Sequence, residues 1–177
     1  MHVKAKTMAF GGILLALSVI CMALGSVIET STLFLLAAAS YFVGIVIREF
    51  GMKAGVAFYL ADVLLGFLLA PNKFYVLSFA AMGLYILFAE GIWRLAGKRE
   101  KMQKKSLIWI LKYILFNVMY IPVLFAFQEL LFGGRTFSGG FLALVFVAGQ
   151  IGLFVYDRAY VYMQREIWSR YRGRLLR

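Results

Sequence analysis

The feature that most constrains this sequence is a series of long apolar runs with almost no charged residue inside them. Between Met8 and Ile28 there is no Lys, Arg, Asp or Glu. The hydrocarbon core of a bilayer is about 30 Å thick and is crossed by about 20 apolar residues in a helix. Of the 177 residues, 63% are hydrophobic and only 15% are charged. A soluble domain of this length cannot bury so much apolar surface, so the sequence predicts a membrane protein.

The runs predict six transmembrane helices. Stretches such as Gly12 to Leu17 do not alternate between apolar and polar residues, which favours helices over the strands of a membrane barrel. The second run is the shortest and could instead form a re-entrant segment. The predicted fold is an all-α integral membrane bundle that forms a single transmembrane domain over residues 1–177. The expected helices are about 8–28, 32–47, 54–70, 74–95, 107–131 and 138–163, with a basic cytoplasmic tail over 164–177.

The basic residues predict the orientation of the chain in the membrane. Of the 19 Lys and Arg, 16 lie in four clusters: before the first expected helix, after the second, after the fourth, and at the C-terminal end. Six helices with both termini inside place all four clusters on the cytoplasmic side, as the positive-inside rule requires. The net charge of +11 is then mainly an orientation signal that also meets anionic lipids of the inner leaflet. We expect a plasma-membrane protein that does not bind nucleic acid, because no aromatic and basic recognition module accompanies the charge.

The sequence lacks the residues of common catalytic centres. His2 is the only histidine and Cys21 the only cysteine, too few for a zinc or haem site of ordinary ligand number. The patterns GxSxG, HExxH and CxxC and the phosphate-binding loop are absent. We therefore expect no enzymatic activity, no cofactor and no metal site. Any ATP-driven work would need a partner protein.

Polar residues within or beside the apolar runs are the candidate binding residues. Asp62 lies in the middle of the third run, where it either binds a ligand or ion or makes an internal structural contact; an ionisable group in lipid costs roughly 2.5–3.5 kcal/mol on insertion scales. Donors and acceptors expected in the outer half fit either a pocket for a small polar metabolite or an ordinary interfacial fringe. The candidate substrate-binding residues are Asp62, Asn72, Tyr75, Ser78, Gln128, Glu129 and Gln150. Ion pairs are expected among the residues near the inner helix ends, namely Glu90, Arg94, Lys112, Asp157 and Arg158.

Small residues gather near one face of the first expected helix. Ala9, Gly12 and Ala16 follow a helical spacing, and Gly12 with Ala16 forms a small-xxx-small pair. Such pairs let helices approach closely in lipid. The pairs Ser40 with Gly44 and Ala148 with Gly152 repeat the spacing. Each pair packs either inside the bundle or against a partner.

The third and fourth runs carry a more specific pattern. Gly55, the stretch Asp62-Val63-Leu64-Leu65-Gly66, Pro71 and Gly83 resemble the third and fourth helices of S components, the substrate-binding membrane subunits of energy-coupling factor (ECF) transporters. The resemblance implies a six-helix fold with both termini inside and an outer pocket for a vitamin-like metabolite. It also implies a transmembrane coupling subunit driven by two ATPase subunits. The family's AxxxA-like docking motif would fall on Gly12 and Ala16, with Ala9 beside it.

Two other functions stay open at this stage. The turn Pro71-Asn72-Lys73-Phe74 lacks the extended Pro-Gly turn of folate-type members, and no vitamin-specific signature is evident. A non-transport scaffold or assembly protein of the cell-shape or sporulation type shares the same helical arrangement. A self-contained carrier is the third possibility, with Asp62 coupling uptake to protons.

Overall fold

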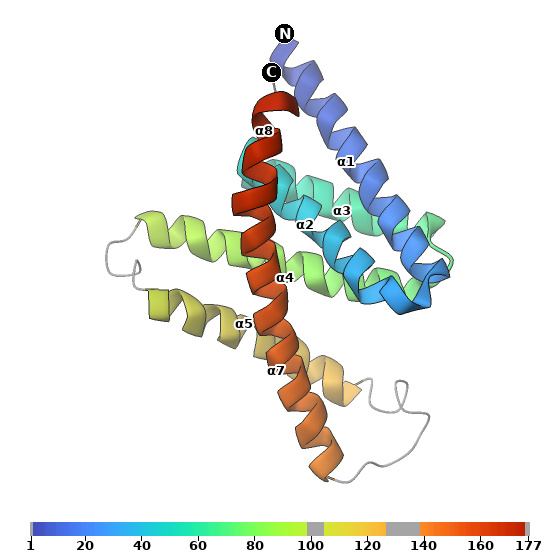
Figure 1. The fold of residues 1–177 in the computed structure, drawn as a ribbon, viewed down its shortest axis with the longest axis vertical. Helices are drawn as coiled ribbons and strands as arrows, with labels where there is room; N and C mark the ends of the chain where they lie inside the picture. The colour runs from blue at the N-terminus through green and yellow to red at the C-terminus, as the bar shows by residue number, and fades with distance from the viewer. Residues whose placement is uncertain (1, 99–104, 127–138, 176–177) are drawn as a thin grey trace. The chain divides into compact units, whose positions relative to one another are not determined.

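Residues 2–98, 105–126 and 139–175 are described by a computed structural model of the chain (Figure 1). Every element of these residues is a helix, and none of them forms a strand. Six of the helical segments are long and apolar enough to cross a membrane. This confirms the predicted all-α fold with six helices of membrane-spanning length.

The helices lie close to the expected ranges. The second helix has 19 residues, which at 1.5 Å per residue gives about 28 Å, enough to cross a bilayer core. The segment expected as a basic tail is helical as far as Leu175, because the last long helix continues through a π-helical stretch. The elements are α1 (His2–Val27), η1 (Glu29–Ser31), α2 (Thr32–Phe50), α3 (Met52–Leu69), α4 (Lys73–Lys98), α5 (Lys105–Ala126), α7 (Gly139–Tyr162), η3 (Met163–Trp168) and α8 (Ser169–Leu175).

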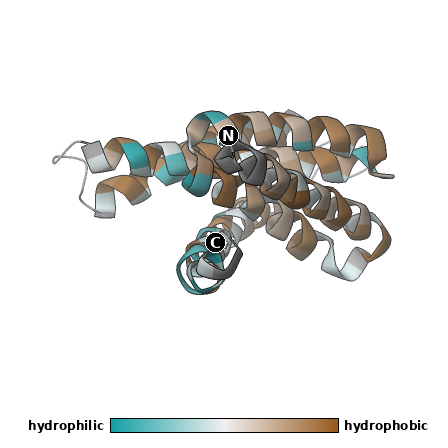
Figure 2. Cartoon of the chain, turned by 90° about the horizontal axis from the view of Figure 1, so that it is seen from above, coloured by the Kyte–Doolittle hydropathy of each residue, from teal (hydrophilic) through white to brown (hydrophobic). Residues whose placement is uncertain are grey.

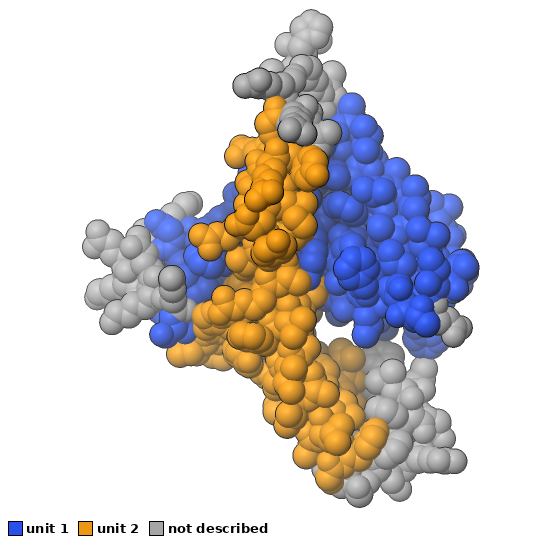
Figure 3. Space-filling view, viewed as in Figure 1, with its two compact units in different colours: residues 1–108 blue, residues 109–177 orange. Residues whose placement is uncertain are grey.

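The chain divides into two compact units, residues 1–108 and residues 109–177 (Figure 3). Each unit is described by itself below. The single transmembrane domain over residues 1–177 stays a prediction.

The first unit is built around α2. This helix is buried along most of its length and packs against α1, α3 and α4. Leu36, Ala39, Val43 and Ile47 recur every three or four residues, so they share one helix face, and each is at most 1% exposed. Large apolar side chains on the outward faces of the helices are exposed; Phe34 of α2, for example, is 75% exposed. Hydrophobic residues cover most of the length of the helices (Figure 2), as expected for surfaces that meet lipid.

Glycines let the helices of the first unit approach closely. A Cβ atom at Gly55 of α3 would lie 2.1 Å from Cγ1 of Ile47 on α2, and one at Gly83 of α4 would lie 2.9 Å from the Tyr59 ring on α3. At Gly66 the nearest atoms, at 3.0 Å, come from α1 and α4. These three glycines are those of the pattern that resembles S components. They therefore serve helix packing within this unit.

In the second unit, α5 and α7 run antiparallel and contact each other through pairs of side chains. The ring of Trp109 stacks on Phe154 near the start of α5, and the ring of Tyr120 lies against Gly149 near its end. Tyr120 also donates a hydrogen bond from Oη to the carbonyl of Val145 at 2.9 Å. In the first unit Tyr59 makes the equivalent contact: its ring lies against a glycine, and its hydroxyl donates to a carbonyl one turn earlier.

Candidate functional site

Asp62 lies inside the first unit. Its side chain is 0% exposed, on the face of α3 that also carries the buried Phe58 and Gly66. Ser18 of α1 donates a hydrogen bond from Oγ to Asp62 Oδ2 at 2.5 Å. The same Oγ lies 3.4 Å from the carbonyl oxygen of Ala39 on α2. Ser18 of α1 therefore lies between Asp62 of α3 and the backbone of α2 in the bundle interior.

The turn between α3 and α4 holds three further candidate residues. Asn72 precedes α4 and accepts a hydrogen bond on Oδ1 from the backbone N–H of Phe74 at 3.0 Å, which is the geometry of an N-cap. Ser78 donates to the carbonyl of Phe74 at 3.1 Å. Tyr75 lies between them in the chain and is half-buried. Two of the three side chains thus bond to the backbone of their own helix.

Lys73 reinforces this turn. Its ammonium group donates to the carbonyl of Ala70 at 2.9 Å and to the carbonyl of Phe67. A cation at the C-terminal end of a helix stabilises the helix dipole and satisfies its last carbonyls. The side chains of Asn72, Lys73 and Ser78 at this turn therefore already hydrogen-bond to the backbone.

The remaining substrate candidates lie elsewhere. Gln150 belongs to the second unit, where its amide pairs with that of Asn117: Nε2 of Gln150 donates to Oδ1 of Asn117 at 2.9 Å, and Nδ2 of Asn117 lies 3.4 Å from Oε1 of Gln150. Gln128 and Glu129 lie outside the described residues. Within the described residues, the structure brings together only Asn72, Tyr75 and Ser78, around one turn.

A groove along α5 is lined by residues between Trp109 and Pro122. Its lining is mostly apolar and includes none of the predicted substrate-binding residues. All of these lining residues come from a single helix, so the groove is an open helix face. The sequence alone gave no signal for it beyond the apolar run of this helix.

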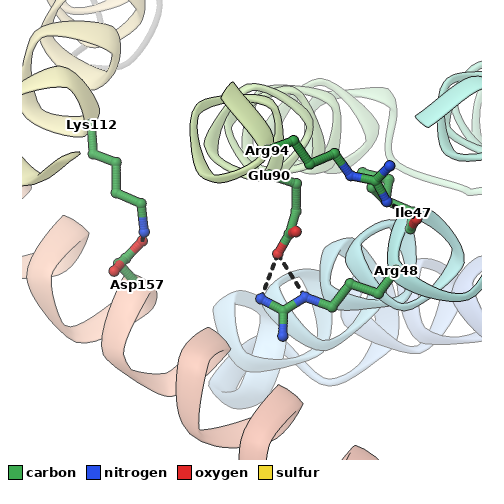
Figure 4. Close-up of polar contacts among 6 residues, drawn as sticks. All are labelled: Ile47, Arg48, Glu90, Arg94, Lys112 and Asp157. Atoms are coloured by element: carbon green, nitrogen blue, oxygen red, sulfur yellow. Dashed lines mark hydrogen bonds and ion pairs between the residues drawn. The ribbon is translucent and has the colours of Figure 1, made fainter. Parts of the chain in front are cut away.

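Ion pairs link helices within each unit, among the charged residues that were expected to form them (Figure 4). In the first unit, Nη2 of Arg48 on α2 lies 2.6 Å from Oε1 of Glu90 on α4. Arg94 of α4 donates to the carbonyl of Ile47, so its observed contact is with the end of α2 rather than with a carboxylate. Arg48 was expected only as part of a basic orientation cluster, so its pairing with Glu90 was not predicted.

The second unit holds the most enclosed ion pair. Nζ of Lys112 on α5 lies 2.6 Å from Oδ1 of Asp157 on α7, and the two side chains are 3% and 2% exposed. The neighbouring residue Arg158 instead lies over the rings of Trp109 and Phe154, with its guanidinium carbon 5.2 and 5.3 Å from their centroids. Of the charged residues expected to form ion pairs, Lys112 and Asp157 pair in this unit, while Arg158 makes cation–π contacts.

The small residues of α1 form a stripe on the outside of the first unit. Ala9, Gly12 and Ala16 are exposed, and a Cβ atom at Gly12 would meet nothing within 4 Å. The opposite face of the same helix, with Ser18 and Met22, is buried in the bundle. The outward face of the helix carries these small residues beside large exposed ones such as Ile13 and Leu17.

The other two small-residue pairs differ from each other. Ser40 and Gly44 of α2 are buried inside the first unit. Ala148 and Gly152 of α7 are exposed, and a Cβ atom at Gly152 would meet nothing within 4 Å. Spacing alone therefore does not tell an internal packing pair from an exposed one.

The described residues contain no group of three or more His, Cys, Asp or Glu side chains placed to hold a metal ion. Comparison of the chain with family models, with curated proteins and with solved structures found no match. The likeness to S components therefore rests on the residues of α1, α3 and α4 described above.

Proposed function

We propose that this chain is the substrate-binding membrane subunit of an ECF-type uptake transporter, with both termini on the cytoplasmic side of the plasma membrane. In this role the chain itself catalyses no reaction. It binds a small vitamin-like metabolite, while a transmembrane coupling subunit and two ATPase subunits supply the energy.

The observation that carries the proposal is the exposed stripe of Ala9, Gly12 and Ala16 on α1. Helices associate in lipid through close van der Waals contact, because lipid tails are as apolar as the helices themselves. Open space beside Gly12 gives a partner helix room to approach the backbone of α1. This is the surface that the resemblance assigns to docking of the coupling subunit.

The substrate would bind on the outer side, at the turn between α3 and α4. Asn72, Tyr75 and Ser78 offer an amide, a phenol and a hydroxyl among aromatic residues, the mixture of groups that small-molecule pockets use. Gln128, Glu129 and Gln150 stay candidates for the same pocket. Asp62 would contact a substrate only if the hydrogen bond from Ser18 were released.

The docking claim is tested by co-purification from cells that also express a coupling subunit and its ATPases. Gly12→Leu and Ala16→Leu place large side chains on the stripe and should abolish recovery of the coupling subunit. Gly152→Leu is the matched control, because this glycine of α7 is also exposed and also has open space beside it. Recovery that is equal in all three variants would show that the stripe is not the docking surface.

A membrane scaffold or assembly protein is the second candidate. It is favoured by one observation: Asn72 and Ser78 bond to the backbone of their own helix rather than converge on a cavity. Native mass spectrometry of the purified protein separates the two functions. A tightly retained small molecule supports transport, while a ligand-free protein that co-purifies only with cell-wall or sporulation proteins supports the scaffold.

A further inference from the structure

The buried carboxyl group of Asp62 is not explained by docking or by a pocket at the outer turn. Asp62 and Ser18 are both 0% exposed. Oγ of Ser18 lies 2.5 Å from Asp62 Oδ2 and 3.4 Å from the carbonyl oxygen of Ala39. The other carboxyl oxygen, Oδ1, has no hydrogen-bond partner among the described residues. The oxygen atoms of Ser18, Ala39 and Asp62 thus lie close together at the contact of α1, α2 and α3. The number of hydrogen atoms that Ser18 and Asp62 can donate decides which hydrogen bonds form among them.

Counting those hydrogens separates two states of the site. A serine hydroxyl has one hydrogen to donate, whereas an ionised carboxylate and a peptide carbonyl can only accept. With an ionised Asp62, Ser18 can satisfy only one of its two acceptor neighbours. With a protonated Asp62 there are two hydrogens for two bonds. The carboxyl O–H donates to Ser18 Oγ, and Ser18 donates to the carbonyl of Ala39.

Among the residues that the structure describes, no Lys or Arg is paired with Asp62. A buried charge without a counter-charge is far more costly than a neutral acid. On α1, the thiol of Cys21 is the titratable group that interacts with Asp62 electrostatically. On α2 and α4, Arg48 and Glu90 bind each other, and Lys73 binds carbonyls at the end of α3.

We propose that Asp62 and Ser18 form an internal proton-binding site. Asp62 holds a proton on Oδ2 and donates it to Ser18, which in turn donates to the carbonyl of Ala39. The chain of two hydrogen bonds ties α3 to α1 and α1 to α2, and it is complete only while the proton is bound. This inference is independent of the transport function, because it concerns the bundle interior rather than the stripe on α1 or the outer turn.

The sequence makes the test unusually direct, because Asp62 and Asp157 are the only two aspartates. Infrared spectroscopy of the whole protein in lipid, labelled with ¹³C at the aspartate carboxyl groups, should show one protonated-acid band and one carboxylate band. Asp62→Asn should remove the acid band. Asp157→Asn is the matched control and should remove only the carboxylate band. Ser18→Ala should shift the acid band to higher frequency, because the acid loses its acceptor.

The wild-type spectrum is decisive even if a variant fails to fold. Two carboxylate bands and no acid band at neutral pH would overturn the proposal. A second result would also overturn it: the thermal midpoint of the wild type rises to saturation with NaCl but not with choline chloride, and Asp62→Asn shows no such rise. This result would assign the site to a metal cation. A midpoint that does not respond to the choice of cation, together with the acid band, supports the proton.

Discussion

The ion pair between Lys112 and Asp157 gives the sharpest prediction about stability. Its atoms are 2.6 Å apart, and both side chains are almost fully enclosed. At an effective dielectric constant of 20, two unit charges at this distance attract each other by about 6 kcal/mol. Removing each ion from water costs several kcal/mol, so the intact pair contributes little net stability. Removing one partner, however, leaves the other charge buried without compensation.

We therefore expect Lys112→Met and Asp157→Leu each to destabilise the protein by about 3–5 kcal/mol. The double variant should lie within about 1–2 kcal/mol of the wild type, because it leaves no charge unpaired. The assay is a double-mutant cycle on the free energy of unfolding, measured by reversible denaturation in mixed micelles or bicelles. Arg158→Met is the control: it alters the adjacent residue, which is exposed and makes cation–π contacts worth about 0.5–1 kcal/mol.

The coupling energy between Lys112 and Asp157 in this cycle tests the role of the pair. Single variants that cost less than about 1 kcal/mol would mean that water reaches the pair and that its burial is not what the structure shows. A double variant whose cost equals the sum of the two single costs would mean that the residues act independently. Either result would refute the role given to this pair.

Three further results are expected. Gly83→Leu should destabilise the first unit by about 1–3 kcal/mol, because the new side chain meets the Tyr59 ring. Gly152→Leu should be close to neutral, because a Cβ atom at this position meets nothing within 4 Å. Thermal unfolding of the two variants in parallel checks this, and equal midpoints would contradict the packing role of Gly83. Tyr120→Phe should cost about 0.6–1 kcal/mol through the lost hydrogen bond to the backbone of α7, measured by the same denaturation and contradicted by an unchanged free energy of unfolding. A cysteine introduced by Arg172→Cys in a Cys21→Ser background should react with a membrane-impermeant maleimide only after the membrane is opened, because the C-terminal end is predicted to be cytoplasmic.

Much of the fold could be predicted from the apolar runs, since their length and lack of charge allow few structures other than membrane helices. Asp62 within the third helix and ion pairing among the charged residues near the helix ends were also predicted, but not which of these residues pair. The sequence did not identify which residues of the neighbouring helices these side chains contact. Ser18 lies four residues from both Leu14 and Met22, which marks the buried face of α1 but does not say which residue of another helix it meets.

The candidate residues at the turn between α3 and α4 show a second limit. Asn72 was selected as a polar residue beside aromatics, but its position directly before a helix is the signature of an N-cap, and the structure shows this bond. Ser78 similarly uses its hydroxyl one turn back along its own helix. Local backbone bonding competes with ligand binding for short polar side chains. Sequence reasoning that counts polar groups without this competition overestimates the size of a pocket.

The unbroken helix from Gly139 to Leu175 fixes how far this part of the chain stands from the bilayer. At 1.5 Å per residue it is roughly 55 Å long, and even a tilt of about 40° lets a bilayer core of about 30 Å enclose only about 39 Å of it. If this helix crosses the bilayer, about three of its turns project beyond the hydrocarbon. The exposed arginines 165, 170 and 172 lie at that end, so a protein or headgroup that meets them encounters charges at fixed angular positions on a stiff rod rather than on a flexible chain.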